Sequence, residues 1–533
     1  MKEGTYMKLT DIKFKEIFPF EEPRKNQREI IERIINAYLN GKKYVILSAP
    51  TGTGKSIIGY SVAKYFGSGY VLTSQKVLQE QYYNDFKLPY VLGRSNYTCL
   101  KNNNYNCEMG ACFRNPKNMC KKNGSISCPY IMARETCLLS NFSNLNYSYF
   151  LAMSEIGGKL KEKEILICDE CHNLESELIK KCTIRIDENL LNFLNNKNIK
   201  IPNISDTSAL KCKWLIIDFF DQIKSDFLFL KNQLNKLDKM KSTREYKKIL
   251  VKHSIFERLI ISIASIKKQL EQNEKIIVNQ DKDFIEFKML HGKNIFNETM
   301  SNYSSRFLFM SATILDYKIF AKDLGLNLKD VEYIECDSNF PVENRLIHYI
   351  PVGSMSFKKK DETIPLLISK IDQILKKNKN VKGIIHTVNY DIAEKIIRGL
   401  SFSDQSTRLL MPRGNDRKLI LDTFYNSSKP YVLISPSLTE GLDLKEDLSR
   451  LCIICKVPYA NLMDKWIKER MKENQDWYVN LACTTMVQMT GRSIRSETDF
   501  AKTYILDKDF ITLAKSGMNM FPKWWKDSVV MYD

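Results

Sequence analysis

The feature that most constrains this chain is a glycine-rich turn between a short apolar run and a helical segment. The apolar run, Tyr44–Ser48, has the pattern of a buried parallel strand, and the turn that follows reads Ala-Pro-Thr-Gly-Thr-Gly-Lys-Ser from residue 49. This is the pattern of a phosphate-binding loop with Ala49 in place of the first glycine. We expect its backbone N–H groups and the positive end of the next helix to bind the phosphates of a nucleotide.

The loop predicts individual roles for its side chains. Lys55 is expected to contact the β- and γ-phosphates, and Ser56 to bind Mg²⁺. The predicted nucleotide-binding residues are consecutive: Thr51, Gly52, Thr53, Gly54, Lys55 and Ser56. A plain glycine-rich turn is the alternative, but the strand before it and the helix after it favour a phosphate site.

A second apolar run, at 165–168, leads into Asp169-Glu170-Cys171-His172. A carboxylate at the end of such a strand suits a Mg²⁺ ligand, which is the role we expect for Asp169. Glu170 is expected to orient and deprotonate the attacking water. An acidic pair alone also occurs on ordinary surfaces, so it is the phosphate loop upstream that makes this pair indicate an ATPase.

Two arginines near the C-terminus lie three residues apart in the segment 488–495, which reads Gln-Met-Thr-Gly-Arg-Ser-Ile-Arg. Arg492 and Arg495 would share one face of a helix. Such arginines can reach across a cleft to the γ-phosphate and stabilise the charge that develops during transfer. Without the other motifs, a solvated surface helix would be the favoured interpretation.

The rest of the chain alternates strand and helix patterns on both sides of a central region. Short apolar runs bounded by turn residues, typical of buried parallel strands, lie at Tyr44–Ser48, 71–74, 165–168, 307–310, Gly383–His386, 431–434, Leu451–Ile454 and 503–506. This alternation predicts an α/β fold with parallel sheets. A chain of 533 residues is expected to form about two to four domains.

Residues 183–285 have a different character. Apolar residues step by three and four along 216–237 and again along 259–270, and the polar stretch 239–247 separates the two series. This spacing predicts two amphipathic helices packed as a hairpin.

Six of the 14 cysteines are concentrated in one segment, namely Cys99, Cys107, Cys112, Cys120, Cys128 and Cys137. The surrounding residues 96–137 are rich in Asn, Gly and Lys and show little apolar periodicity, so a loop of this length needs something to hold it. In a cytosolic protein such a cluster indicates metal binding rather than disulfides. Thiolates suit Zn²⁺ or an iron–sulphur cluster, and their spacing alone leaves both open.

Taken together, these segments resemble the XPD/DinG family of superfamily 2 helicases over almost the whole chain. The motifs occur in the order of that family: Arg24 and Gln27 at the adenine segment, 51–56 at motif I, 73–75 at motif Ia, 93–99 and 128–130 at the borders of the iron–sulphur insert, 169–172 at motif II, 311–313 at motif III, 383–389 at motif IV, 435–443 at motif V and 488–495 at motif VI. Cys171 stands where alanine is usual, a swap that keeps the side chain small.

The resemblance implies two RecA-like motor domains that bind ATP and Mg²⁺ between them. The implied bounds are 1–96, 138–182 and 286–322 for motor domain 1, 97–137 for an iron–sulphur insert, 183–285 for a helical arch and 323–533 for motor domain 2. Arg492 and Arg495 would come from motor domain 2. The resemblance also implies nucleotide contacts for Arg24, Gln27, Gly441, Asp443 and Gln488. It further implies that the motor moves 5′ to 3′ on single-stranded DNA.

The family position favours a [4Fe–4S] cluster over zinc. Cys99 and Cys128 are the best-anchored ligands because motif residues flank both, and Cys120 is expected as a third. The fourth ligand is Cys112 or Cys107, with Cys112 preferred. Cys137 lies on a helical stretch beyond the insert, where a buried core position is expected. The cluster is expected to hold a wedge that separates the duplex.

The bulk composition agrees with a polyanionic partner. The chain has 81 Lys+Arg against 62 Asp+Glu, a formal net charge of +19, which suits nucleic acid. No apolar run approaches the ~20 residues of a membrane span, so a cytoplasmic or nucleoid location without membrane contact is expected. The expected partner is single-stranded or forked duplex DNA, bound by a monomeric motor. The alternatives are a translocase or remodeller that does not unwind, an RNA helicase, and a non-enzymatic zinc scaffold.

Overall fold

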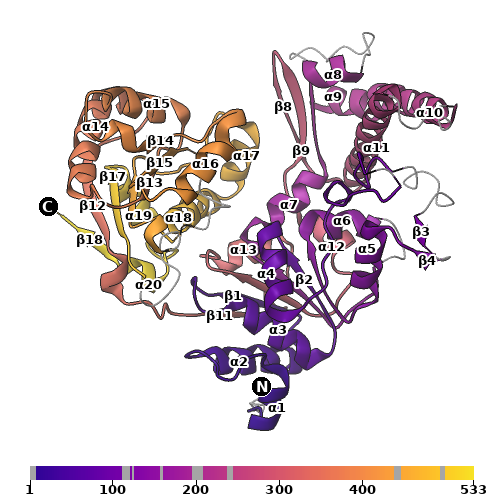
Figure 1. Ribbon diagram of the computed structural model, residues 1–533, viewed down its shortest axis with the longest axis horizontal. Helices are drawn as coiled ribbons and strands as arrows, with labels where there is room; N and C mark the ends of the chain where they lie inside the picture. Colours follow the sequence, from indigo (N-terminus) through magenta and orange to yellow (C-terminus); the bar gives the residue numbers. More distant parts are fainter. Residues whose placement is uncertain are drawn as a thin grey trace.

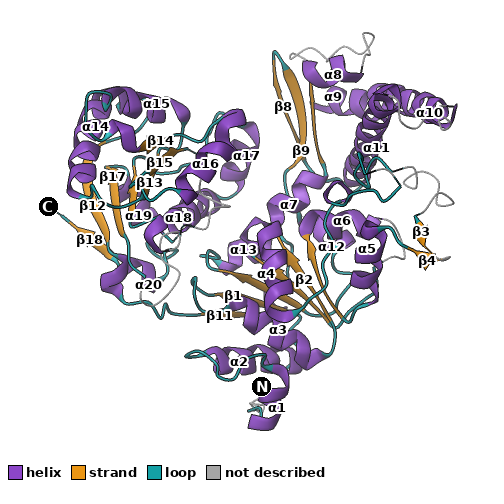
Figure 2. Ribbon diagram, in the orientation of Figure 1, coloured by secondary structure: helices purple, strands orange, loops and turns teal. Residues whose placement is uncertain are grey.

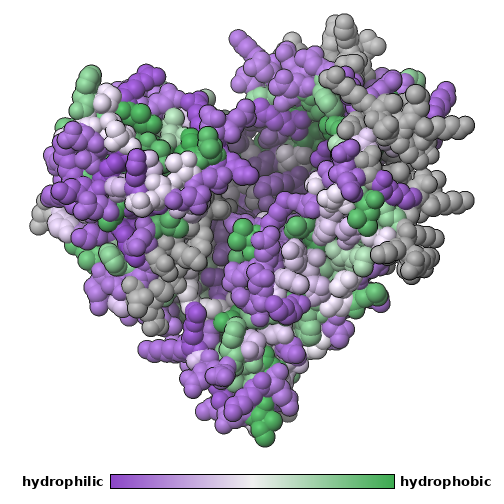
Figure 3. Space-filling view, viewed as in Figure 1, coloured by the Kyte–Doolittle hydropathy of each residue, from purple (hydrophilic) through white to green (hydrophobic). Residues whose placement is uncertain are grey.

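The computed structural model shows two α/β lobes with an arch above one of them (Figure 1). It describes residues 8–101, 103–110, 120–122, 125–155, 160–194, 208–236, 244–436, 444, 446–491 and 499–532. The molecular surface is hollowed between the second lobe and the arch, and hydrophilic residues predominate around this recess (Figure 3).

Motor domain 1 is built on a six-stranded, wholly parallel sheet. Its strand order is β11 (Val331–Glu335), β1 (Tyr44–Ser48), β10 (Phe307–Ser311), β6 (Ile165–Asp169), β2 (Gly69–Thr73) and β5 (Phe142–Asn146). Its helices are α1 (Asp11–Ile17), α2 (Gln27–Leu39), α3 (Lys55–Phe66), α4 (Lys76–Phe86), α5 (Pro129–Leu139), α6 (Tyr147–Glu155), α7 (Leu174–Lys181), α12 (Lys293–Thr299) and α13 (Tyr317–Asp323).

Helices cover both faces of this sheet, which explains why its central strands are mostly apolar. Tyr44 and Ile46 of β1 pack into the core shared with α6, α7 and α12. Val45 and Leu47 point to the opposite face and pack against α2 and α3. Because successive side chains of a strand face opposite sides, a strand buried on both faces must be apolar throughout.

Motor domain 2 repeats the architecture with a seven-stranded parallel sheet. The order is β14 (Leu409–Leu410), β15 (Val432–Ser435), β13 (Gly383–His386), β16 (Leu451–Ile454), β17 (Lys502–Asp507), β12 (Ile347–Gly353) and β18 (Val529–Met531). Its helices are α14 (Lys360–Lys377), α15 (Tyr390–Gly399), α16 (Arg417–Asn426), α17 (Lys465–Glu473), α18 (Gln475–Thr490), α19 (Phe510–Ser516) and α20 (Lys523–Lys526). Trp525 of α20 is buried and donates a hydrogen bond to Thr490 Oγ1 at 2.8 Å, which docks the tail on this domain.

The arch contains both helices expected from the sequence. They are α10 (Phe220–Lys236), which continues a short π-helix at Leu215–Phe219, and α11 (Arg244–Glu271), and they pack side by side. Smaller helices α8 (Glu188–Leu194) and α9 (Ser208–Trp214) precede them. A three-stranded antiparallel sheet of β7 (Thr183–Asp187), β9 (Phe284–Met289) and β8 (Ile276–Asp281) joins the arch to motor domain 1 (Figure 2).

The cysteine-rich insert leaves motor domain 1 after α4 and returns at α5. Its described residues include a short antiparallel pair of β3 (Lys121–Lys122) and β4 (Ser125–Ile126). Cys137 lies on α5 and is buried. Cys112 lies outside the described residues.

The structure agrees with the expected fold class of two RecA-like parallel sheets. It differs at one expected boundary, because β11 pairs with β1 and residues 331–335 therefore belong to the first sheet rather than to motor domain 2. Among the described residues no helix is both long enough and apolar enough to span a membrane.

Candidate active site

The phosphate loop connects β1 to α3, and its glycines are required by close neighbours. Gly52 and Gly54 have φ of +88° and +83°, in the left-handed region that favours glycine. A Cβ on Gly52 would lie 2.1 Å from Phe340 Cζ, and one on Gly54 would lie 2.2 Å from Gln27 Nε2. The loop is thus held between the segment that links the two motor domains and the start of α2.

The two residues assigned to the adenine segment bind the phosphate loop directly. Gln27 Nε2 donates to the carbonyl of Thr53 at 2.9 Å, and Arg24 Nη1 donates to the carbonyl of Gly52 at 2.7 Å. Gln27 Oε1 also accepts the backbone N–H of Arg24 at 2.8 Å. Contacts to the base by these residues would therefore be transmitted to the loop that holds the phosphates.

The acidic pair lies at the carboxyl end of β6, on the same sheet edge as the phosphate loop. Asp169 is 3% exposed. Burial, followed by the charge of Glu170, raises its pKa to about 6, while Lys55 opposes the rise. Glu170 has φ of +50°, a strained conformation for a non-glycine residue. Lys55 donates to the carbonyl of Ala49 at 3.1 Å.

Motif III is hydrogen-bonded to motif II at this edge. Ser311 Oγ, at the end of β10, lies 2.8 Å from His172 Nδ1 and donates to Glu170 Oε2 at 3.4 Å. The backbone N–H of Thr313 donates to Ser311 Oγ at 3.2 Å. Glu170 Oε2 also lies 3.3 Å from His172 Nδ1. A change in the position of Glu170 would therefore shift the segment that follows β10.

Tyr82 is a site residue that the sequence reasoning missed. It is 1% exposed on α4, and its hydroxyl donates to Asp169 Oδ2 at 2.9 Å and also interacts with Ser56. Its contacts thus link the two expected Mg²⁺ ligands to the helix that follows motif Ia. The only sequence signal was a tyrosine at a buried position of an amphipathic helix, which ordinary core packing also produces.

We predict that Tyr82→Phe lowers kcat for ATP about tenfold and leaves KM nearly unchanged. The substitution removes a hydrogen bond to a charged group, a contribution of about 1.5–3 kcal/mol, and frees the Asp169 carboxylate to rotate. Steady-state ATPase kinetics measure both constants. Tyr83→Phe is the matched control because the neighbouring Tyr83 is exposed, and its ring contacts Tyr90 edge-on and the ammonium group of Lys87. Equal losses in both variants would contradict the assignment.

Motor domain 2 reaches the phosphate loop through the end of α18. Pro50 and Thr51 line a small cavity of about 40 Å³ together with Thr490 and Gly491, the residues just before the expected arginines. Gln488 lies on α18 and is half-buried. The predicted residues Arg492, Arg495, Gly441 and Asp443 lie outside the described residues.

Motif IV contains a strained residue at the carboxyl end of β13. Val388 has φ of +66°, which is rare for a β-branched side chain. Its neighbour Asn389 caps α15 by accepting the N–H of Ile392 at 2.9 Å, and Thr387 Oγ1 donates to the carbonyl of Asn389 at 3.0 Å. Such strain persists where the surrounding structure fixes it, and it is typical of functional loops.

Four cysteines of the insert come together: Cys99, Cys107, Cys120 and Cys128. They are 3%, 3%, 4% and 1% exposed. Cys107 Sγ lies 3.9 Å from Cys128 Sγ, and Cys120 interacts with both Cys99 and Cys128. Burial and then Cys128 raise the pKa of Cys107 to about 12.

The backbone explains how Cys99 and Cys107 are held. Thr98 and Asn106 form an antiparallel bridge, Cys99 donates its N–H to Tyr105 at 2.8 Å, and Cys107 donates to Tyr97 at 2.7 Å. These contacts bring both thiols to one side, opposite Cys128 at the start of α5.

Comparison with known proteins matches most of the chain. The family model "Helicase C-terminal domain" matches residues 371–528, and "Type III restriction enzyme, res subunit" matches residues 20–200. The "Probable ATP-dependent helicase MJ0942" of Methanocaldococcus jannaschii is 22% identical over 93% of this chain and 93% of that protein. The ATP-dependent DNA helicase YoaA of Haemophilus influenzae is 21% identical over 92% and 91%.

Solved structures give the same result for the fold. A structure titled "XPD_Helicase" has a TM-score of 0.67 at 18% identity and covers 96% of this chain and 100% of its own. The Xpd4 protein of S. tokodaii has a TM-score of 0.58 at 15% identity, with coverage of 96% and 100%.

Two RecA-like sheets that meet over one phosphate loop, with the helicase motifs in order, define an ATP-dependent helicase of superfamily 2. The structure titled "XPD_Helicase" aligns over nearly the whole length of both chains, so the likeness in fold includes more than the two sheets. The family models, the helicase relatives and the fold together support an XPD/DinG-like helicase of superfamily 2.

Proposed function

We propose that the protein uses ATP to move 5′ to 3′ along single-stranded DNA and to open forked duplexes. The observation that carries the proposal is the hydrogen-bonded contact of motif III with motif II beside the phosphate loop, at the edge facing motor domain 2. DNA is favoured over RNA because YoaA is named a DNA helicase. The polarity rests on the family resemblance, and the net charge of +19 suits a phosphate backbone.

The motor residues have separable tasks. Ser56 and Asp169 are expected to hold Mg²⁺, which when bound supplies positive charge to the β- and γ-phosphates. Lys55 neutralises the same oxygens, and Glu170 accepts a proton from the attacking water. Arg492 and Arg495, from motor domain 2, complete the site when the cleft closes.

Movement requires that each motor domain grips the strand in alternation. Thr73 ends β2 in motor domain 1 and Ser74 follows it, and Ser435 ends β15 in motor domain 2. Hydroxyls and backbone amides at such positions bind phosphates without reading sequence. If closure and opening alternate the tighter grip, each ATP advances the strand.

The insert fits a metal centre. Buried thiols that lie together are unstable as separate thiolates, because burial and the neighbouring Cys128 raise the pKa of Cys107, and a bound cation would offset this charge. We propose Cys99, Cys107, Cys120 and Cys128 as the ligands of a [4Fe–4S] cluster, which when bound cross-links the insert through metal–thiolate bonds. Zinc is the rival, since four bonds of about 2.3 Å in a tetrahedron also suit thiols 3.9 Å apart.

The direct test uses a forked duplex with matched tails. We expect single-stranded DNA to stimulate ATP turnover at least about tenfold, typical of coupling between two sites, and we expect strand separation only when a 5′ tail is present. A labelled fork, its 3′-tailed counterpart and an RNA strand of the same sequence are the substrates. Stimulation without separation would favour a translocase, stronger stimulation by RNA would favour an RNA track, and no ATP turnover would contradict the proposal.

A further inference from the structure

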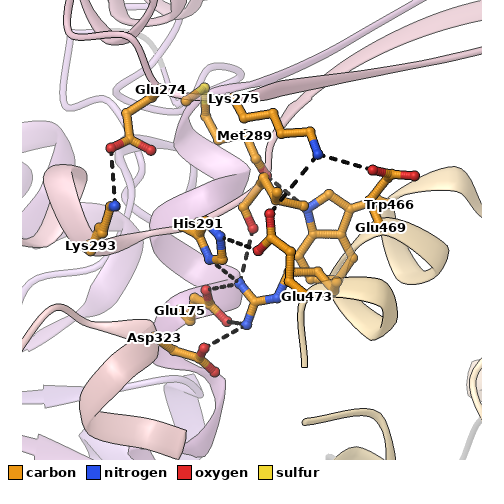
Figure 4. A network of polar contacts seen from close by, with 12 residues as sticks. Glu175, Glu274, Lys275, Met289, His291, Lys293, Asp323, Trp466, Glu469 and Glu473 are labelled. Atoms are coloured by element: carbon orange, nitrogen blue, oxygen red, sulfur yellow. Dashed lines mark hydrogen bonds and ion pairs between the residues drawn. The ribbon is translucent and has the colours of Figure 1, made fainter. Parts of the chain in front are cut away.

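Helix α17 of motor domain 2 reaches across to motor domain 1 and to the base of the arch (Figure 4). Its sequence from Lys465 is Lys-Trp-Ile-Lys-Glu-Arg-Met-Lys-Glu, a pattern typical of a solvated helix. Arg470 nevertheless has only 2% of its surface exposed. A fully buried arginine needs partners for its charge and its N–H groups.

Arg470 finds these partners on elements of the other lobe. Its guanidinium binds Glu175 in a bidentate manner, at 2.6 and 3.1 Å, and donates to Asp323 Oδ1 at 2.7 Å. It also lies 3.0 Å from the carbonyl of Leu290 and 2.9 Å from His291 Nδ1. The ligand atoms of Glu175, His291 and Asp323 lie within 4.8 Å of one another, gathered around the one guanidinium.

Aromatic and apolar residues pack around this contact. The guanidinium carbon lies 4.6 Å from the ring centre of Trp477 and 5.4 Å from that of Trp466. Trp466 Nε1 donates to the carbonyl of Met289 at 2.8 Å. Both tryptophans belong to an apolar cluster that includes Ile179 and Ile319 of motor domain 1. A desolvated cation between two indole rings gains further stabilisation.

The contact is costly to break once it has formed. Glu175 and Asp323 have side chains only 15% and 16% exposed. Burial, followed by repulsion from Glu175, raises the pKa of Asp323 to about 8. Burial also raises the pKa of Glu175. The charge of Arg470 opposes both increases. Removing one member of a buried ionic cluster is strongly destabilising because the others stay buried without a partner. We therefore expect α17 to remain docked throughout the cycle.

The partners of Arg470 directly follow functional motifs. Glu175 lies on α7, three residues after His172 of motif II, and Asp323 ends α13, the helix that follows Ser311–Thr313 of motif III. His291 follows β9, the strand by which the arch returns to motor domain 1. The side chain of Arg470 thus contacts the segments that follow motif II, motif III and the returning strand of the arch.

A cavity next to this contact leaves room for motion. It measures about 400 Å³, and its walls include His172 and Thr313 of motor domain 1 and Leu481 and Thr484 of α18. With α17 fixed, α18 can approach the ATPase motifs by rotation about the Arg470 contact. The end of α18 leads to the expected arginines, so such a rotation would bring them towards the phosphate loop.

We propose that Arg470 is a positioning residue for ATP hydrolysis and that α17 is the pivot on which motor domain 2 turns. Through its contacts with Glu175, Asp323 and His291, the pivot keeps motif II, motif III and the base of the arch in fixed relative positions. Nucleic acid bound by the arch and the motor domains can therefore set the geometry of Glu170. The inference rests on the proposed function, because it needs ATP turnover that responds to single-stranded DNA.

The test compares Arg470→Lys and Asp323→Asn with Lys472→Met on the full-length protein. Lysine keeps the charge but cannot bind Glu175, Asp323 and His291 together, and Asp323→Asn leaves the bidentate pair with Glu175 intact. Lys472 is exposed on the same helix and pairs only with Glu469. We expect Arg470→Lys to lower kcat at saturating single-stranded DNA about tenfold, within the range of inter-site coupling, with smaller loss for Asp323→Asn.

Two further quantities separate positioning from mere support of the fold. KM for ATP should stay near the wild-type value in both variants, and turnover without DNA should fall less than turnover at saturating DNA, whereas all constants of Lys472→Met should stay near wild type. Proportional loss of turnover with and without DNA, tracking a loss of folded protein in thermal denaturation, would overturn the proposal, as would unchanged stimulation in Arg470→Lys. If the wild-type protein itself shows no DNA stimulation, it is the proposed function that fails.

Discussion

Replacing Lys55 by alanine is expected to lower DNA-stimulated ATP turnover about 1,000-fold, the upper range for loss of one charge-stabilising donor. Lys55 is the first residue of α3, and it interacts electrostatically with Asp169 at the acidic edge. In the structure its ammonium group donates to the carbonyl of Ala49. Its removal leaves the fold intact, because no buried carboxylate depends on it alone. Steady-state ATPase assays at saturating Mg²⁺ measure the loss.

Lys64→Ala is the matched control, since Lys64 is an exposed lysine in the last turn of the same helix. Glu170→Gln provides a second comparison. It keeps the shape of the side chain but removes the proton acceptor, so turnover should fall about 100- to 10,000-fold while ATP binding persists. Turnover that survives in Lys55→Ala would mean that the phosphate-loop assignment is wrong, and equal defects in Lys64→Ala would indicate a general loss of fold.

The strands of the two motor domains could be predicted because burial on both faces dictates their composition. Tyr44–Ser48, Gly383–His386 and Leu451–Ile454 have the expected bounds. Each lies inside a parallel sheet, where burial on both faces favours a nearly continuous apolar run. The arch hairpin could be predicted as well, because the apolar residues of α10 and α11 recur at helical spacing.

Elements that depend on a remote partner were not predictable. The strand β11 lies at the edge of its sheet and has only two buried residues, Val331 and Ile334, so only its pairing with β1 assigns it to motor domain 1. The small sheet at the base of the arch escaped notice for the same reason, because β7 and β9 are far apart in sequence yet pair antiparallel. Short edge strands carry too little apolar pattern to be distinguished from loops.

The site shows the same division between local and remote information. Lys55, Asp169 and Glu170 are fixed by motifs that the sequence displays. The roles of Tyr82 and Arg470 could not be predicted, because each lies on a helix whose own sequence does not indicate the partner that it contacts. A charged helix such as α17 predicts solvent exposure, and only the opposing lobe makes its arginine a buried residue.

The insert was predicted as a metal centre, but the choice between Cys107 and Cys112 could not be made from spacing. The backbone bridge between Thr98 and Asn106 is a tertiary feature that sequence does not reveal, and it turns Cys107 towards Cys128. The ligand set proposed above therefore replaces Cys112 with Cys107, a change that a pair of single substitutions can test.

Cys107→Ser is expected to abolish cluster assembly, whereas Cys112→Ser is expected to retain it. A hydroxyl is a poor substitute for a thiolate, so the cluster loses a ligand in the first variant only. Protein purified without oxygen should contain about four irons per chain in the wild type and in Cys112→Ser, with a brown absorption band. Cys107→Ser should contain little iron and lose fork unwinding.

The proposed cluster ligands lie in the insert, away from the phosphate loop, so ATP turnover without DNA should survive in Cys107→Ser. That separation is what distinguishes a wedge held by the cluster from a misfolded motor. Loss of iron in Cys112→Ser alone would restore Cys112 as the ligand. Zinc in place of iron in the wild-type protein would replace the cluster with a tetrahedral thiolate site, and it would leave the motor unaffected because none of its residues contributes a ligand to the insert.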